Sequence, residues 1–237
     1  MVITKIPAAR SSAAEERKLG VGSQSETVRI NEIFFSLQGE TSRTGLPTVF
    51  VRLTGCPLRC GYCDTAYAFH EGSTHSIDAV VAEVSRHKTR YVCVTGGEPL
   101  AQKYCIALLK RLVDAGFSVS LETSGALDIA PVDARVSRIV DIKTPGSGEV
   151  EKNRWSNIAL LTAHDEVKFV LCSEDDYRWA VGILHEHKLD TRCPVLFSPV
   201  FGDLSATALA EWILRDQLPV RMQIQLHKVL WNDARGK

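Results

Sequence analysis

The sequence predicts an α/β fold, a partial barrel of the (βα)6 type whose parallel strands carry the functional residues at their carboxyl ends. Short β-rich runs alternate with segments of helical spacing along the chain, and such alternation favours parallel strands joined by right-handed crossovers. About 210 residues are expected to fold, whereas eight βα units take about 250. A doubly wound open sheet is the alternative architecture.

The strands are expected where β-branched and aromatic residues gather in short apolar runs. We predict strands at Thr48–Leu53, Tyr91–Thr95, Ser118–Glu122, Arg138–Ile142, Val167–Leu171, Val195–Phe197 and Met222–Leu226.

Four helices are expected between these strands. The first begins after the capping residue Ser76, and the third begins after Ser173. The second ends near Gly116, a residue type that commonly terminates helices. Apolar residues at helical spacing define three of these helices. They are Ile77, Val80, Val81 and Val84 in the first helix, and Cys105, Leu108, Leu109, Leu112 and Val113 in the second. In the fourth helix they are Leu209 and Ile213.

Residues 1–25 have little apolar periodicity and are expected to form a flexible tail, so that residues 26–237 make a single domain. The segments 146–166 and 231–237 have no clear assignment, and the former is expected to be a variable connection.

Composition excludes several classes of protein. The 237 residues include 28 basic and 28 acidic side chains, and 45% are apolar, which argues against wholesale disorder and against a nucleic-acid coat. No apolar run approaches the roughly 18 residues of a membrane span, and we expect no membrane partner. Three of the seven cysteines fall within eight residues, which predicts a metal or redox site in a reducing compartment, the cytoplasm.

The cysteine loop, Gly55–Thr65, follows the first predicted strand and spaces Cys56, Cys60 and Cys63 as C-x3-C-x2-C. Such soft ligands suit iron–sulfur clusters, zinc or copper(I). Three thiolates on a cubane leave one of its four irons open for a ligand. The alternative is a structural zinc that takes His70 or His75 as its fourth ligand.

A second motif favours the cluster. Tyr62 precedes the last cysteine of the loop, and the strand at Tyr91–Thr95 runs into Gly96-Gly97-Glu98-Pro99. The two motifs together resemble the radical S-adenosylmethionine (SAM) enzymes. The resemblance implies a radical SAM barrel in which a [4Fe-4S] cluster and SAM generate a 5′-deoxyadenosyl radical. It also implies an electron donor such as flavodoxin or ferredoxin.

Further stretches narrow the resemblance to the 7-carboxy-7-deazaguanine synthase family of 7-deazapurine and queuosine biosynthesis. They are Ser36-Leu-Gln-Gly-Glu40, Glu122-Thr-Ser-Gly125, Asp141-Ile-Lys-Thr-Pro145, Phe197-Ser-Pro-Val200 and Leu226-His-Lys228, in family order. The members of this family are lyases, and the resemblance implies that the chain converts 6-carboxy-5,6,7,8-tetrahydropterin to 7-carboxy-7-deazaguanine with loss of ammonia. A homodimer and bound Mg²⁺ are also implied.

The resemblance assigns site residues by position. Those implied for the pterin are Leu37, Gln38, Gly39, Glu40, Arg52, Thr95 and His227. Those implied for SAM are Tyr62, Cys63, Asp64, Gly97, Glu98, Ser124, Asp141, Lys143, Phe197, Ser198, Pro199 and Val200. Thr65 is the implied Mg²⁺ ligand, and Cys56, Cys60 and Cys63 hold the cluster.

Each position also has an ordinary interpretation. Arg52 could be an ion-paired strand residue, Gln38 and Glu40 a polar turn, and His227 an interior histidine. Two other functions stay open at this point: an activating enzyme that forms a glycyl radical on a protein, and a zinc-stabilised binding module without catalysis.

Overall fold

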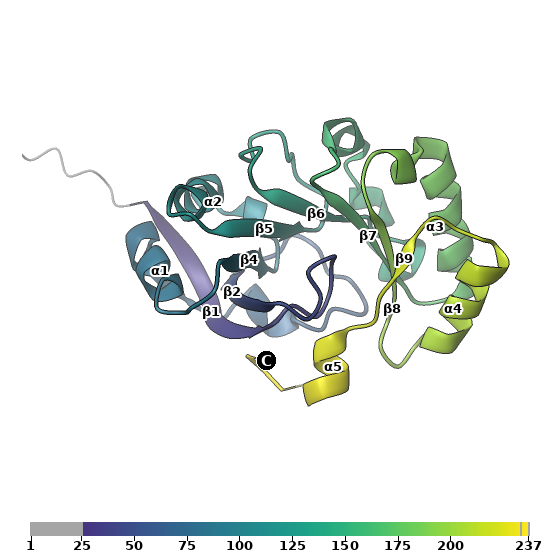
Figure 1. Cartoon of the computed structure of the whole chain (residues 1–237), viewed down its shortest axis with the longest axis horizontal. Helices are drawn as coiled ribbons and strands as arrows, with labels where there is room; N and C mark the ends of the chain where they lie inside the picture. The colour runs from purple at the N-terminus through teal and green to yellow at the C-terminus, as the bar shows by residue number, and fades with distance from the viewer. Residues whose placement is uncertain (1–25, 233, 237) are drawn as a thin grey trace, which may run out of the picture.

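A computed structural model describes residues 26–232 and 234–236, which build one curved sheet with helices along its outer side (Figure 1). The predicted tail, 1–25, lies outside the described residues. The strand order is β3-β1-β2-β4-β5-β6-β7-β8-β9. The strands are β1 (Thr27–Leu37), β2 (Pro47–Leu53), β3 (Ser73–Ser76), β4 (Tyr91–Gly96), β5 (Ser118–Thr123), β6 (Ser137–Asp141), β7 (Glu166–Leu171), β8 (Val195–Pro199) and β9 (Arg221–Met222).

Neighbouring strands in the series β2, β4, β5, β6, β7, β8 and β9 pair in parallel, and β1 pairs antiparallel with both β2 and β3. The α/β prediction with a mostly parallel sheet is therefore confirmed. Six of the seven predicted strands lie within two residues of the observed ones. The strand predicted at Met222–Leu226 is wrong, because pairing stops at Met222 and a helix begins at Leu226.

Helices α1 to α4 cover the outer side of the sheet, and α5 lies apart from them at the bottom of the view (Figure 1). They are α1 (Ile77–Val84), α2 (Cys105–Asp114), α3 (Glu174–His187), α4 (Ala206–Arg215) and α5 (Leu226–Trp231). The predicted caps are present, since the hydroxyls of Ser76 and Ser173 accept bonds from Ala79 N and Asp176 N. No helix in the described part of the chain is long and apolar enough to cross a membrane.

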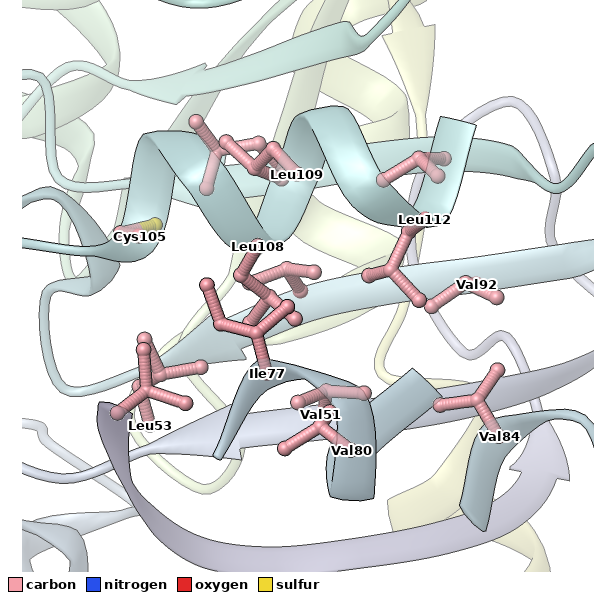
Figure 2. Close-up of a cluster of buried hydrophobic side chains, with 14 of the residues drawn as sticks. Val51, Leu53, Ile77, Val80, Val84, Val92, Cys105, Leu108, Leu109 and Leu112 are labelled. Atoms are coloured by element: carbon pink, nitrogen blue, oxygen red, sulfur yellow. The ribbon is translucent and has the colours of Figure 1, made fainter. Parts of the chain in front are cut away.

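Two apolar cores join these helices to the sheet. The first lies between α1, α2 and strands β1, β2, β4 and β5, and Figure 2 shows Leu108 and Leu112 of α2 pointing toward Ile77 and Val80 of α1 and the strands below. The second joins α3 and α4 to β6, β7 and β8. Full burial of one such leucine contributes about 1.5–3 kcal/mol, so these contacts fix the strands whose ends carry the site.

The connection between β6 and β7 contains three short 3-10 helices, Pro145–Ser147, Val150–Lys152 and Trp155–Leu160. It occupies most of the segment expected to be variable. Asn157 is buried there, and its amide donates to Gly125 O at 3.0 Å and Leu127 O at 2.8 Å. The connection is thereby tied to the turn that follows β5.

Candidate active site

A cavity of about 640 Å³ opens at the carboxyl ends of the parallel strands. Its wall takes one residue or more from each of the parallel strands β2, β4, β5, β6, β7 and β8 or from the turns directly after them, as the fold class predicts. Examples are Arg52, Thr95, Ser124, Lys143, Lys168 and Ser198. The volume is typical of a small-molecule site.

The cysteine loop forms one side of this cavity, directly after β2. Cys56, Cys60 and Cys63 are free thiols that line it. The loop starts against the turn after β4: Glu98 N donates to Gly55 O at 2.8 Å, and Gly97 N donates to Leu53 O at 3.2 Å. A Cβ on Gly97 would lie 2.2 Å from Gly55 O. The second glycine of the Gly-Gly-Glu-Pro motif is thus needed for close approach of two backbones.

The three thiols suit a cubane cluster. Burial raises the pKa of the Cys56 and Cys60 thiols, and the neighbouring cysteines raise it further. Within residues 26–232 and 234–236, no group of three or more His, Cys, Asp or Glu side chains is arranged to hold a metal ion. A cubane makes a different demand, because each thiolate binds a different iron and the sulfurs need not converge on one point.

Polar groups without partners lie next to the cysteines. Among the described residues, the Tyr62 hydroxyl and Asp141 Oδ1 are buried without a hydrogen bond. Asp141 Oδ2 accepts from Lys143 Nζ at 2.9 Å. Burial lowers the pKa of Lys143, but the Asp141 carboxylate reverses this and raises it above its usual value. Since buried polar groups are normally paired, these two atoms indicate a polar ligand.

Three residues assigned to SAM do not line the cavity. Glu98 is fully buried, and its carboxylate accepts from Leu100 N at 3.0 Å, Ser124 N at 2.7 Å and the hydroxyls of Thr123 and Ser124. Direct contact of Glu98 with a ligand is therefore not supported; it ties the turn after β4 to the turn after β5. Phe197 and Pro199 are buried away from the cavity, whereas Ser198 and Val200 line it.

Glu122, near the end of β5, organises another part of the cavity wall. Its carboxylate accepts from Gln38 Nε2 at 3.3 Å and from Thr95 Oγ1 at 3.0 Å. Cys93 Sγ lies 3.4 Å from the same carboxylate. Gln38 and Thr95 are both buried. The sequence analysis identified Glu122 as part of a motif at a strand end but assigned it no role in the site.

Glu40 and Lys168 form a second buried pair on the cavity wall. Lys168 Nζ lies 2.7 Å from Glu40 Oε2, and Gln225 Nε2 donates to Glu40 Oε1 at 3.1 Å. Burial would raise the pKa of the Glu40 carboxyl, but the Lys168 ammonium outweighs it and holds the pKa at about 2. Lys168 was missed, although a charged residue inside the apolar run Val167–Leu171 could have indicated it.

Arg52 is paired as well as exposed to the cavity. Its Nε–H donates to Glu32 Oε1 at 2.8 Å, and Tyr67 Oη donates to the same oxygen at 2.8 Å. The guanidinium carbon lies 5.7 Å from the Phe34 ring centroid and 6.0 Å from that of Tyr67. The Glu32 bond takes one of the five N–H donors of the guanidinium, and both aromatic rings lie within the range of a cation–π contact.

The remaining assigned residues lie in the same cavity. Leu37, Gly39, Asp64, Thr65 and His227 all line it. A Cβ on Gly39 would lie 2.7 Å from His227 Nδ1, so the bare glycine lets α5 approach the loop that follows β1. Thr65 Oγ1 lies 3.8 Å from Cys63 Sγ.

Comparison with known proteins agrees with this geometry. Residues 50–202 match the model of the radical SAM superfamily. The 7-carboxy-7-deazaguanine synthase of Chlorobaculum tepidum is 48% identical over 88% of this chain and 97% of its own length. The 7-carboxy-7-deazaguanine synthase of Koribacter versatilis is 43% identical over 86% of this chain and 97% of its own length. The crystal structure of QueE from Escherichia coli has a TM-score of 0.70 at 25% identity, covering 85% of this chain and 95% of that one.

These relatives do not favour the two alternative functions, the glycyl-radical activating enzyme and the zinc-stabilised binding module. The family match spans the cysteine loop and the strand ends from β2 to β8, and the synthases match over nearly their whole length. The chain belongs to the radical SAM superfamily and, within it, to the 7-carboxy-7-deazaguanine synthase family.

Proposed function

We propose that this chain is a 7-carboxy-7-deazaguanine synthase that converts 6-carboxy-5,6,7,8-tetrahydropterin to 7-carboxy-7-deazaguanine with loss of ammonia. One observation carries the proposal. A single cavity is lined both by three free cysteines and by Gln38, Thr95 and Glu122, a hydrogen-bonded group that lies in the same cavity as Arg52. A radical cofactor and a polar heterocycle would therefore meet in one enclosed space.

On the cofactor side, Cys56, Cys60 and Cys63 would hold a [4Fe-4S] cluster, and SAM would bind beside it. The bound pair supplies a 5′-deoxyadenosyl radical for hydrogen abstraction. Asp141 Oδ1 and the Tyr62 hydroxyl, both without hydrogen-bond partners among the described residues, could accept and donate bonds to the polar groups of SAM. Lys143, held by Asp141, adds a positive charge beside the cysteines.

On the substrate side, the donors and acceptors suit a pterin. Glu122 offers carboxylate oxygens to the N–H groups of the pterin edge, while Gln38 offers both a donor and an acceptor. Arg52 offers a guanidinium to the substrate carboxylate, a pairing favoured by its fork geometry. His227 adds a polar group from α5.

Several finer features belong to the same proposal. Thr65 would be the protein ligand of Mg²⁺, with substrate oxygens and waters completing an octahedron. Pro57 and Arg59 of the cysteine loop are exposed, which would give an electron donor such as flavodoxin or ferredoxin a short path to the cluster. Exposed apolar side chains such as Leu214 and Val229 would suit burial in a homodimer. We place residues 26–237 in one catalytic domain and the protein in the cytoplasm, in keeping with its seven free cysteines.

The test is an anaerobic assay with iron- and sulfide-loaded protein, SAM, dithionite and 6-carboxytetrahydropterin. We expect about four irons per chain and formation of carboxydeazaguanine, and the Cys60→Ala variant should lose both. In Arg52→Lys, pterin binding should weaken far more than SAM binding. Loaded wild-type protein that cleaves SAM but leaves the pterin unchanged would refute the proposed substrate.

A further inference from the structure

Lys168 lies close to carboxylates from two different parts of the cavity wall. It lies on β7, is buried, and lines the wall. Its Nζ lies 2.7 Å from Glu40 Oε2, in the loop after β1, and 3.7 Å from Asp141 Oδ2, at the end of β6. One ammonium thus contacts a carboxylate assigned to the pterin and approaches one assigned to SAM.

The burial of Lys168 makes these contacts strong. Burial alone would lower the pKa of the ammonium, but Glu40, Asp141 and Glu122 raise it well above the usual value. The side chains of Lys168, Glu40 and Asp141 are each no more than 15% exposed, so water screens their charges little. If one carboxylate changes position, the Lys168 ammonium shifts with it, and the electrostatic interaction of the ammonium with the other carboxylate changes as well.

Both carboxylates have a second contact that faces a ligand site. Glu40 Oε1 accepts from Gln225, which also donates to Asp64 Oδ2 at 3.3 Å beside the cysteine loop. Asp141 Oδ2 is shared with Lys143, and its Oδ1 is buried without a partner among the described residues. A ligand that binds either carboxylate would redistribute the contacts of Lys168.

We propose that Lys168 is a positioning residue that couples the binding of the pterin to the binding of SAM. It does so by holding Glu40 and Asp141 in their ligand-ready positions, and it touches neither reacting atom. Occupation of one side fixes the ammonium and its carboxylates, and the other ligand then meets a site that is already ordered. Such coupling is reciprocal, so each ligand must raise the affinity for the other by the same factor. The inference rests on the proposed function for the identity of the two ligands.

The experiment measures that factor directly. Anaerobic titration calorimetry on cluster-loaded protein gives the Kd of SAM with and without saturating 6-carboxytetrahydropterin, and the Kd of the pterin with and without SAM. We expect a coupling factor of about fivefold or more in the wild type, the lower end of typical allosteric coupling. Lys168→Met should reduce it to about one, and Lys168→Arg, which keeps the charge, should restore part of it.

Arg138→Lys is the matched control for a general loss of stability. Arg138 is a buried cation on the neighbouring strand β6, paired with Asp165 at 2.6 Å and outside the cavity wall. Its replacement should destabilise the fold and leave the coupling factor unchanged. If Lys168→Met does not fold, Glu40→Gln tests the same link from the other end and should also lose the coupling.

The outcomes separate the two proposals. A wild type that binds SAM but not the pterin overturns the proposed function and this inference with it. A wild type that binds both ligands without coupling overturns the inference alone. So does a Lys168→Met or Glu40→Gln variant that keeps the wild-type factor, or an Arg138→Lys variant that loses it.

Discussion

Replacement of Gly97 by alanine should expel the cluster while leaving the sheet intact. A Cβ at this position would lie 2.2 Å from Gly55 O, 2.6 Å from Gly55 C and 2.8 Å from Cys56 Cβ, where ordinary contact begins at 3.4 Å. The backbone at the start of the cysteine loop must therefore move by more than 1 Å. Overpacking of this kind costs about 1–3 kcal/mol, and the bond from Glu98 N to Gly55 O would be strained as well. Metal–sulfur bonds tolerate only about 0.2 Å, so Cys56 would no longer match the other two cysteines.

The assay is iron and sulfide content after anaerobic reconstitution. We expect Gly97→Ala to retain less than one iron per chain against about four in the wild type. Gly182→Ala is the control, because Gly182 lies on the exposed face of α3 and a Cβ there meets no other atom within 4 Å. Equal iron content in the two variants would refute the argument that the close backbone contact positions the loop.

Three further changes test other parts of the structure. The pKa of Glu40 is held at about 2 against an ordinary 4.5. Its ionised form therefore contributes about 3 kcal/mol of stability above pH 4.5, and this contribution is lost as the pH falls toward 2. Glu40→Gln should lower the urea-unfolding free energy of cluster-free protein by about that amount at pH 7, and by clearly less at pH 3. Gly39→Ala should displace His227, whose Nδ1 would lie 2.7 Å from the new Cβ, and weaken pterin binding about tenfold, or about 1.4 kcal/mol; unchanged pterin affinity would argue against a role for His227. Asp165→Asn removes one charge of a buried ion pair with Arg138 and should cost about 3–5 kcal/mol, and an unfolding midpoint equal to that of the wild type would contradict this.

The parallel strands β2, β4, β5, β6, β7 and β8 could be predicted because they are largely buried and each contains a short run of β-branched or other apolar residues. β1 escaped prediction for the opposite reason. It alternates buried Val28 and Ile30 with the polar residues Arg29 and Asn31, and its pairing with β2 shifts register between Ile30 and Glu32. The position of β1 is set by its pairing with β2, and a local sequence pattern cannot predict such pairing. The error at Met222–Leu226 has a related cause, since the sequence shows apolar residues there but only Met222 pairs with β8, and Leu226 already begins α5.

Site residues were predicted from motifs, and motifs fix the order of residues along the chain without fixing the direction of each side chain. On β8, Ser198 faces the cavity and its neighbours Phe197 and Pro199 do not, as the twofold alternation of strands requires. Glu98 follows Gly97 in the same motif, yet its carboxylate points into the protein. Glu122 and Lys168 were assigned no role in the site because their importance comes from partners distant in sequence, Gln38 and Glu40.

The cavity holds its cations in pairs. Arg52 is bonded to Glu32, its cross-strand partner, while Lys143 is bonded to Asp141 and Lys168 to Glu40. An unpaired buried charge would be costly, so pairing lets these cations remain charged without a ligand. A carboxylate-bearing ligand therefore meets oriented cations and exchanges one anionic partner for another, instead of drawing flexible side chains out of water. Because orientation is achieved during folding, little ordering remains to oppose binding. The same pairing explains why Lys168, which contacts carboxylates on both sides, is the position at which the two ligands can influence each other.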